Sequence, residues 1–396
     1  MNKGIEIARG KTKVLYEQPG QPDVLVTAQT DSISAGDGAR RNEISGKGRL
    51  AAQTTARVFR LLNLCGLPTH YMSGGEDDDN NEMLVRRCNM IPLEVVTRGV
   101  AAGSLIKRNP SLQRGALIVP RMVEFFFKDD ANHDPLISIE EIISRNIATP
   151  VEVGIMTEIA RLTFEILAHA WRKRDTLLVD LKIEFGRLTG GENKGNLVIA
   201  DVIDNDSWRI WPQGREELML DKQLYRNLES VKPEDLERVK NAYEAVAEQV
   251  GTFPQMRPGM VAIVTEGPEY DEAAKRIVQA LQSFGLPSVR RVASALRTPG
   301  YVLQMVQQLD TSFPRLLYIA LGGTDGALRG MIENATASPV FDGAEPESIA
   351  LRAAKAFALD DTVLFGRTLL VQTNARTAIL QADASVNAPP PNPTLA

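Results

Sequence analysis

The heptapeptide DLKIEFG, which begins at Asp180, places a charged side chain at every second position. Because side chains alternate along a β-strand, Asp180, Lys182 and Glu184 would share one face while the apolar residues face a core. A second apolar run, 197–200, precedes Asp201 and would form a hairpin that brings Asp201 near Glu184. Two carboxylates beside a lysine could hold a hard divalent cation and a phosphate. The alternative is an ordinary surface strand with a polar outer face.

Two glycine-containing segments near the N-terminus could also approach an anion. In ARGKTKVLYE, Gly10 precedes Lys11 and Lys13, and glycine lets the backbone come close to a ligand. The spacing is not that of a P-loop, and by itself the segment is better explained as a solvated basic turn. TDSISAGDGARR surrounds Asp37 with glycines ahead of Arg40. That pattern suits a loop over a small polar substrate or an ordinary turn.

Two further segments combine charges with small or apolar residues. VTRGVAAGSLIKRNP sets Arg98 and Ser104 around a run of alanine and glycine. Small residues admit backbone amides to a phosphate, and arginine and serine supply charge and hydroxyl donors. FFFKDDANHDP ends an apolar strand in Lys128, followed by acids around His133. We interpret His133 as a turn residue satisfied by local carboxylates rather than as a metal ligand.

These segments belong to a chain long enough for more than one domain. Residues 1–250 mix strands and helices and end in a helical pattern, while 251–260 is rich in proline and glycine and is predicted to be a linker. Residues 261–385 alternate apolar strands with helices, which is typical of a parallel, doubly wound α/β domain. Residues 386–396 form a Pro-rich tail that need not be ordered.

Composition excludes several classes of function. The net charge of −5 argues against nonspecific nucleic-acid binding. The sequence contains neither an apolar run near the length of a membrane span nor a signal-peptide core at its start, so we expect no membrane association. Cys65 and Cys88 are too few for a disulfide framework or a cysteine-based zinc site. We therefore expect a cytoplasmic protein.

Seven segments taken together, in this order, resemble the SAICAR synthetase family: GKTKVLYE, SAGDGARR, MIPLEVVTRGVAAGSLIKRNP, FFFKDDANHDP, VDLKIEFG, ADVIDNDSWRIWPQG and DKQLYR. The resemblance covers roughly residues 5–250. It implies an α+β ATP-binding synthetase domain that joins the carboxylate of CAIR (carboxyaminoimidazole ribonucleotide) to the amine of L-aspartate, with ATP and Mg²⁺. A carboxylate is a poor electrophile, so the implied route is phosphorylation to an acyl phosphate followed by attack of the amine.

The resemblance also implies roles for individual residues on the nucleotide side. Lys11 and Lys13 match the turn that binds the ATP phosphates, and Glu184 and Asp201 match the acids that hold the metal. Met90 lies where the family's hinge backbone meets adenine. The full set implied for the nucleotide and its metal is Lys11, Lys13, Arg86, Met90, Lys128, Glu184 and Asp201.

On the substrate side, the resemblance places Asp180 and Lys182 by CAIR and assigns the CAIR phosphate to Arg98, Ser104 and Arg209. The set implied for substrate binding is Asp37, Arg40, Arg98, Ser104, Lys182, Asp206 and Arg209, where Asp206 orients Arg209. The set implied for catalysis is Lys11, Asp180, Lys182 and Arg209.

The second domain resembles, more loosely, AIR carboxylase over residues 261–341. Leu296 stands where that family carries the histidine of a Ser-Ala-His sequence, and TEGPEYDE replaces a glycine-serine loop. Leucine cannot transfer a proton, and Glu266 and Glu269 would repel a substrate phosphate. We therefore expect a divergent carboxylase-like domain that has lost catalysis and serves assembly. The alternative is that another residue performs the step.

The order of the two domains resembles that of the bifunctional animal-type purine-biosynthesis enzyme. We therefore expect an ATP-dependent ligase that acts on the small molecules CAIR and L-aspartate and forms a homo-oligomer through its C-terminal domain. One rival is a fully bifunctional enzyme that also carboxylates AIR to CAIR. Another is a non-catalytic nucleotide-binding scaffold, which the ordered acids, lysines and arginines of the first domain disfavour.

Overall fold

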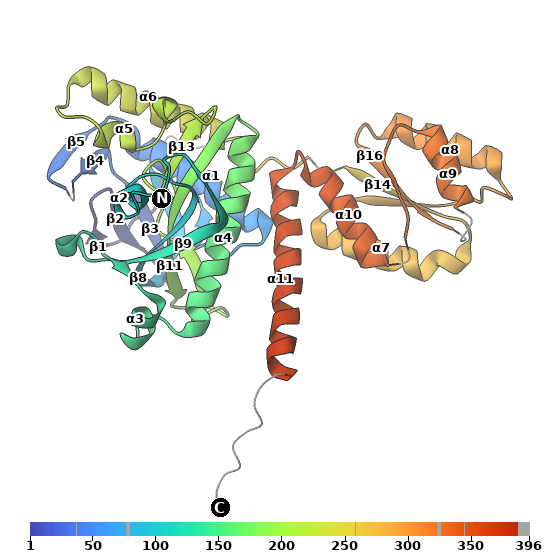
Figure 1. The fold of residues 1–396 in the computed structure, drawn as a ribbon, viewed down its shortest axis with the longest axis horizontal. Helices are drawn as coiled ribbons and strands as arrows, with labels where there is room; N and C mark the ends of the chain where they lie inside the picture. The colour runs from blue at the N-terminus through green and yellow to red at the C-terminus, as the bar shows by residue number, and fades with distance from the viewer. Residues whose placement is uncertain (37, 77–79, 258, 323–325, 344, 387–396) are drawn as a thin grey trace, which may run out of the picture. The chain divides into compact units, whose positions relative to one another are not determined.

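The computed structural model divides the chain into two compact units, Met1–Pro254 and Gln255–Ala396 (Figure 1). The structure describes all residues except 37, 77–79, 258, 323–325, 344 and 387–396. The proposed Pro-rich tail therefore lies, from residue 387 on, outside the described residues, and so does Asp37. Among the described residues, no helix is long and apolar enough to cross a membrane.

The first sheet of unit Met1–Pro254 has five antiparallel strands in the order β1-β2-β3-β7-β6. They are β1 (Glu6–Arg9), β2 (Lys13–Gln18), β3 (Gln21–Gln29), β6 (Tyr71–Ser73) and β7 (Glu82–Arg86). Helix α1 (Lys47–Cys65) packs on β3, β6 and β7 and buries a stripe that includes Leu50, Phe59 and Leu62. Gly66 ends the helix with a φ of 94°, a conformation that glycine adopts without strain.

The second sheet of this unit is also antiparallel, in the order β10-β9-β8-β11-β12, and β13 pairs with β11. The strands are β8 (Cys88–Val100), β9 (Leu117–Phe127), β10 (Leu136–Ile137), β11 (Thr176–Leu188), β12 (Leu197–Ala200) and β13 (Trp208–Pro212). Glu184 lies opposite Ala200, so the predicted hairpin is confirmed. β13 pairs with the first half of β11, placing Arg209 opposite Asp180. On the other side of β11, Arg98 also lies opposite Asp180.

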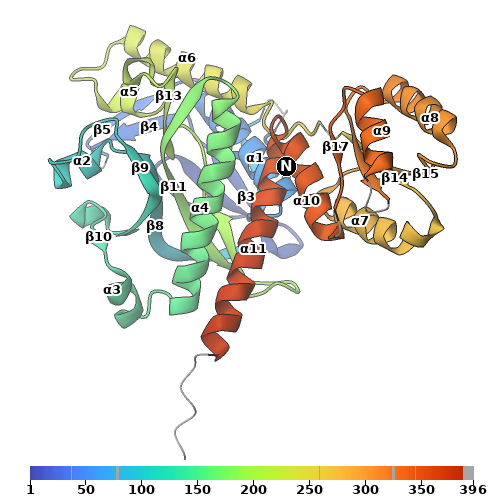
Figure 2. The same ribbon diagram turned by 45° about the vertical axis from the view of Figure 1, so that its right-hand side comes forward.

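Helix α4 (Pro150–Arg172) packs on β8, β9 and β11 (Figure 2). Its start is fixed by a capping box: the Thr149 hydroxyl accepts from the Glu152 backbone N–H at 3.2 Å, and the Glu152 carboxylate accepts from the Thr149 N–H at 2.8 Å. The helix and the apolar face of β11 bury Leu181, Ile183 and Phe185. The charged face of the strand is thereby turned away from this core.

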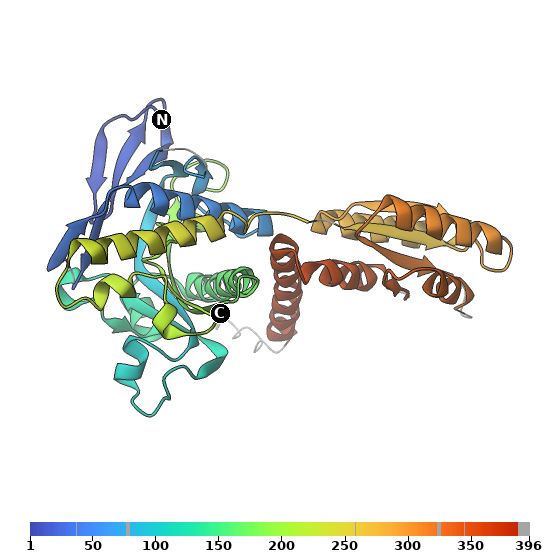
Figure 3. The same ribbon diagram turned by 90° about the horizontal axis from the view of Figure 1, so that it is seen from above.

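Shorter elements complete the unit: a hairpin of β4 (Ser32–Ala35) and β5 (Arg40–Glu43), the helices α2 (Ser104–Arg108), α3 (Ile139–Ser144), α5 (Gln223–Arg226) and α6 (Pro233–Val250), and the 3-10 turns η1 (Asp130–Asn132) and η2 (Glu216–Leu218). Helix α6 runs alongside α1 (Figure 3). Tyr225 and Tyr243 are buried together with apolar residues of the hairpin and of both helices. This cluster ties the hairpin and α5 to the rest of the unit.

Unit Gln255–Ala396 contains a parallel sheet in the order β15-β14-β16-β17. Its strands are β14 (Met260–Thr265), β15 (Ser288–Val292), β16 (Leu316–Leu321) and β17 (Val340–Phe341), with the short η3 (Pro268–Tyr270) after β14. Val261 and Ile263 pack toward α7 (Asp271–Phe284), α10 (Pro346–Ala358) and the start of α11 (Thr362–Val386). Ala262 and Val264 pack toward α8 (Pro299–Ser312) and α9 (Ala327–Ala335). Helices on both faces confirm the predicted doubly wound fold.

Candidate active site

A cavity of about 450 Å³ opens beside the charged face of β11. It is lined by Glu94, Val96, Arg98, Ser104, Arg108, Phe126, His133, Asp134, Pro135, Leu136, Asp180, Lys182, Asp206, Ser207, Trp208, Arg209 and Arg226. Six of these were predicted from the sequence: Arg98, Ser104, Asp180, Lys182, Asp206 and Arg209. The sheet register brings them together, because β8, β11 and β13 are neighbours. Asp180 and Lys182, two of the three alternating charges of β11, therefore line a cavity instead of an ordinary solvent-exposed face.

At one end of the cavity, Asp180 joins two arginines from the strands on either side. Its carboxylate accepts from the Arg98 guanidinium at 3.1 Å and from Arg209. Arg98 also donates to the Ser104 hydroxyl at 3.2 Å. Asp180 is only 5% exposed, so its negative charge acts at short range on both guanidiniums and fixes their direction. Guanidiniums held in this way, with a hydroxyl beside them, suit a phosphate or carboxylate ligand.

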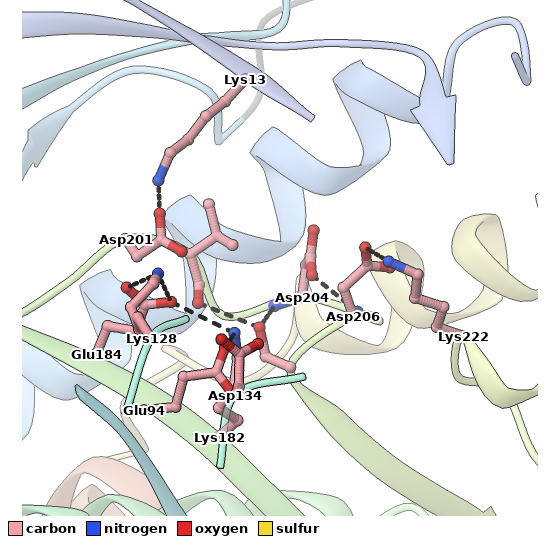
Figure 4. A network of polar contacts seen from close by, with 12 residues as sticks. Lys13, Glu94, Lys128, Asp134, Lys182, Glu184, Asp201, Asp204, Asp206 and Lys222 are labelled. Atoms are coloured by element: carbon pink, nitrogen blue, oxygen red, sulfur yellow. Dashed lines mark hydrogen bonds and ion pairs between the residues drawn. The ribbon is translucent and has the colours of Figure 1, made fainter. Parts of the chain in front are cut away.

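At the other end, lysines and acids alternate (Figure 4). Lys182 donates to Glu94 at 2.7 Å and to Glu184 at 3.3 Å, and Lys128 donates to both oxygens of Glu184 at 2.8 and 2.7 Å. Burial alone would raise the pKa of Glu184, but Lys182 and Lys128 outweigh it and hold that pKa below its usual range. Burial likewise opposes the charge of Lys182, and Glu94 and Glu184 outweigh it and raise the Lys182 pKa. Both shifts favour the charged forms of Glu184 and Lys182.

Beside this cluster, Lys13 of β2 forms an ion pair with Asp201, the residue that follows β12 (Figure 4). Asp201 has a φ of 65°, a conformation that few non-glycine residues adopt and that turns the chain sharply at the strand end. Burial, together with the positive charges of Lys128 and Lys182, lowers the pKa of Lys13 to about 8. The Lys13–Asp201 ion pair thus joins the two sheets of the unit, and the low pKa of Lys13 makes the charge of this lysine depend on pH near neutrality.

The predicted metal ligands, Glu184 and Asp201, fit Mg²⁺ by their chemistry. Both are carboxylates, and Asp201 directly follows Ala200, the β12 residue that pairs with Glu184 of β11. Within the described part of the chain, no three of the His, Cys, Asp and Glu side chains gather as a metal site. Mg²⁺ is commonly held by one or two carboxylates plus substrate phosphates. Two carboxylates are therefore a sufficient protein contribution, provided that phosphates supply further oxygens.

Asp206 does not orient Arg209 as the sequence suggested. Its carboxylate accepts from Lys222 at 2.6 Å and from the Tyr243 hydroxyl, whereas Asp180 is the acid that pairs with Arg209. The reason is the register: Asp180 lies directly opposite Arg209, while Asp206 belongs to the loop before β13. Lys47 and Lys222 hold the pKa of Asp206 low despite its burial.

The remaining predicted residues that the structure describes lie outside the cavity lining. Arg40 donates to the backbone carbonyls of the 225–228 segment, including that of Tyr225 at 2.6 Å, and its guanidinium lies over the Tyr225 ring. Arg86 at the end of β7 donates to the Thr69 carbonyl. Met90 on β8 is 44% exposed. Lys11 precedes β2 and accepts a hydrogen bond from Arg41 through its backbone oxygen.

Comparison with protein families identifies this arrangement. A family model described as SAICAR synthetase matches residues 6–250, which is more than half of the chain. The chain belongs to the SAICAR synthetase family. A second model, described as AIR carboxylase, matches residues 260–357. The SAICAR synthetase unit is thus fused to an AIR carboxylase-like domain, as the sequence resemblance indicated.

Several known proteins are similar to this SAICAR synthetase family member. The phosphoribosylaminoimidazole-succinocarboxamide synthase of Herpetosiphon aurantiacus is 49% identical over 253 residues, which are 64% of this chain and 100% of that protein. The bifunctional phosphoribosylaminoimidazole carboxylase/phosphoribosylaminoimidazole succinocarboxamide synthetase of Drosophila melanogaster is 38% identical over 345 residues, 86% of this chain and 79% of that protein. A solved SAICAR synthetase in complex with ADP has a TM-score of 0.54 at 33% identity and covers 62% of this chain and 97% of its own.

In the AIR carboxylase-like domain, the residues at the carboxyl ends of β14 and β15 depart from the expected pattern. Leu296, at the position where the sequence resemblance places a histidine, is 73% exposed. Ser294 accepts from the Arg297 backbone N–H at 3.2 Å and donates to Glu266 at 3.5 Å. Glu266 follows the end of β14 directly. A carboxylate therefore lies at the strand ends, and an apolar side chain lies where the sequence resemblance places a titratable one.

Sequence reasoning missed several residues that line the cavity, above all Glu94 and Asp134. Glu94, Val96 and Arg98 alternate along β8 just as the charges alternate along β11, so this signal was present in the sequence. Asp134 follows η1, in a turn whose backbone adopts positive φ, and no periodic pattern marks it. Such a loop residue can be recognised as part of the cavity only once the pairing of β10 with β9 is known.

Proposed function

We propose that the protein is an ATP-dependent ligase that condenses CAIR with L-aspartate to give SAICAR, ADP and phosphate. The observation that carries the proposal is a cavity lined by the guanidiniums of Arg98 and Arg209 and by the Lys182–Glu94 ion pair, with Glu184 bound to Lys182 beside it. The guanidinium end suits the phosphate of CAIR, while Lys182 lies where the CAIR carboxylate would be. Membership of the SAICAR synthetase family supports the same reaction.

The chemistry asks mainly for positioning and charge neutralisation. A CAIR carboxylate oxygen attacks the γ-phosphorus of ATP and ADP leaves, which gives an acyl phosphate. The aspartate amine then attacks the acyl carbon, a proton leaves the nitrogen, and phosphate departs. Lys182 would bind the carboxylate oxygens and Asp180 would keep Arg98 and Arg209 directed at the ribonucleotide phosphate. Lys11 would stabilise negative charge on the transferred phosphoryl group.

We assign the nucleotide to the junction of the two sheets. Lys13 of β2 and Lys128, which follows β9, would neutralise the ATP phosphates, and Met90 and Arg86 would border the adenine. Glu184 and Asp201 would hold Mg²⁺, which supplies charge neutralisation between the phosphates. Removing the Glu184 carboxylate would take away the partner of Lys128 and one of the two partners of Lys182, and it would leave the ion without one of its two protein ligands.

The test is SAICAR formation from CAIR, L-aspartate and Mg-ATP by the purified full chain, together with Mg-ATP binding by calorimetry. We expect turnover, and we expect Glu184→Ala to abolish Mg-ATP binding. Glu17→Ala is the matched control. Glu17 lies on the same strand as Lys13, but its side chain is half exposed and its ion pair with Arg87 is long, at 3.9 Å, and therefore weak. Binding without turnover would instead favour a nucleotide-binding scaffold.

For the AIR carboxylase-like domain, we propose loss of catalysis and a role in homo-oligomer assembly. The exposed Leu296 offers no proton donor or acceptor where the sequence resemblance places a histidine. The full chain should not accelerate the decarboxylation of CAIR to AIR in the absence of ATP and aspartate. Acceleration over buffer would establish the bifunctional alternative. Analytical ultracentrifugation of the full chain tests the assembly. Small-molecule substrates and a cytoplasmic setting accord with this purine-biosynthesis role.

A further inference from the structure

Glu124 lies on β9, behind the arginines of the cavity. It is opposite Val96 of β8 in the sheet register, and its side chain is 12% exposed. One carboxylate oxygen accepts from Nε of Arg98 and the other from Nη2 of Arg108. Both arginines line the cavity, whereas Glu124 is not among the residues that line it in the described structure. Glu124 therefore bridges two arginines without facing the space that a ligand would fill.

The two arginines need such a bridge. Arg98 is on a strand, but Arg108 is the last residue of the five-residue helix α2, and its side chain is 31% exposed. A long side chain at a helix end loses up to about 2 kcal/mol of rotamer entropy when it is fixed, and like charges repel. A carboxylate that accepts from both guanidiniums offsets both costs. The Phe126 ring, 5.4 Å from the Arg108 guanidinium, further restricts it.

The hydrogen-bond geometry leaves Arg98 with donors for a ligand. A guanidinium has five N–H donors. Glu124 accepts from Nε, Asp180 from Nη1 and Ser104 from Nη2. Each terminal nitrogen thus retains a second N–H. Because Glu124 occupies Nε, the N–H groups that remain for a ligand are those of the two terminal nitrogens.

We propose that Glu124 is a positioning residue that holds Arg98 and Arg108 as a pair at the cavity, and that Arg108 is a further ligand for the anionic end of the substrate. This inference rests on the proposed function for the identity of that anion, the CAIR phosphate. It adds Arg108 to the ligands of that phosphate and explains why a carboxylate lies so close to an anion-binding site. The two guanidiniums that pair with Glu124 neutralise the negative charge of this carboxylate.

The experiment compares Glu124→Gln with the wild type by initial-rate kinetics of SAICAR formation. Glutamine keeps the shape of the side chain but loses the charge that pairs with both arginines. We expect the KM for CAIR to rise about tenfold or more, as when an outer-shell partner of a ligand is removed. The KM for ATP should stay within about twofold, because the ATP phosphates are assigned to the lysine cluster. Glu124→Asp should restore part of the CAIR affinity.

The matched control is Glu165→Gln. It removes a similar ion pair, at 2.7 Å, with Arg121 of β9, away from the cavity lining. Arg108→Ala should also raise the KM for CAIR, and the double variant should fall short of the product of the two single effects, because Glu124 acts in part through Arg108. Arg108 is partly exposed, so this variant tests the inference even if Glu124→Gln does not fold.

A second readout separates this inference from the proposed function. Calorimetric titration with inorganic phosphate needs no turnover, and Glu124→Gln and Arg108→Ala should each weaken phosphate binding about tenfold while Glu165→Gln does not. An inactive wild type would overturn the proposed function and leave this binding test standing. Unchanged phosphate affinity and CAIR KM in both cavity variants would overturn the inference. Equal changes in the KM of all substrates, with a lower Tm, would reduce Glu124 to a structural residue.

Discussion

At the scale of single residues, Arg98 carries the most specific prediction. It is 2% exposed and its guanidinium is held by Asp180, Glu124 and Ser104. Arg98→Ala removes a ligand of the CAIR phosphate, and truncating one member of a buried charge pair costs about 2–5 kcal/mol. We expect the KM for CAIR to rise about 30-fold or more and the KM for ATP to change little. Steady-state kinetics with each substrate varied in turn measures this, and equal effects on both substrates would contradict the assignment.

A second residue-scale prediction concerns pH. The pKa of Lys13 is lowered to about 8 by burial, so its ammonium is charged below that pH and becomes neutral above it. Because only the charged form attracts the ATP phosphates, kcat/KM for ATP should fall as pH rises through about 8. Lys13→Arg keeps its charge at alkaline pH and should remove this fall. The check is a pH profile of kcat/KM for ATP in both proteins, and an identical alkaline fall in both would assign it to another group.

At the scale of elements, the β4–β5 hairpin and the segment 225–228 form one structural unit through Arg40. This arginine donates to three backbone carbonyls and lies 4.7 Å from the Tyr225 ring centroid. Arg40→Ala should therefore release both segments, with a loss of about 2 kcal/mol in the free energy of unfolding. Hydrogen exchange should increase at residues 40–43 and 225–228. Arg9→Ala, which breaks an exposed ion pair with Glu6, is the control and should change neither.

Hydrogen exchange of the Arg40→Ala variant, read together with its KM for CAIR, decides what Arg40 does. The sequence resemblance places it in a loop over the substrates, whereas its hydrogen bonds in the structure hold the protein's own backbone. A rise in the KM for CAIR without any change in hydrogen exchange would show direct contact with the substrate. Faster exchange in both segments would show that Arg40 acts through the position of the 225–228 segment, which includes the cavity residue Arg226.

The elements also show where sequence reasoning succeeds. The alternation of Asp180, Lys182 and Glu184 predicts a strand with a charged face, and the position of Asp201 predicts the hairpin, because both signals are local. The partners across the sheet are not local. That Asp180 rather than Asp206 holds Arg209 follows from the pairing of β11 with β13, and that Glu124 reaches Arg98 follows from the pairing of β8 with β9. Register between strands distant in sequence leaves no periodic signal.

At the scale of the whole molecule, the two units differ in how far the sequence predicts them. The doubly wound order of strands and helices in unit Gln255–Ala396 follows from apolar strands alternating with amphipathic helices. The boundary between the units is less visible in the sequence. Residues 251–260 contain prolines and glycines, yet Phe253 is 1% exposed and packs edge-on against Trp171 at 4.9 Å between ring centroids. The proline content of a segment can be read from the sequence, but a buried contact between two residues far apart in the sequence cannot.

The position of Phe253 gives a prediction about where the synthetase unit ends. A fragment 1–254 should fold alone and form SAICAR with the substrate KM values of the full chain, because Met1–Pro254 is a compact unit and the Herpetosiphon aurantiacus relative aligns with this chain over its whole length in 253 residues. A fragment 1–250 should be less stable by about 3 kcal/mol, because it lacks the buried Phe253 ring and the contact of that ring with the Arg174 guanidinium.

Urea unfolding of both fragments measures the difference, and the fragment 1–254 with Phe253→Ala is the matched control, which should resemble 1–250. Equal stability of the two fragments would place the end of the synthetase unit at residue 250 and make 251–254 part of the linker. An inactive but folded fragment 1–254 would instead show that the AIR carboxylase-like domain is needed for the synthetase reaction. In that case its retention in the chain would have a catalytic reason, beyond the assembly role proposed above.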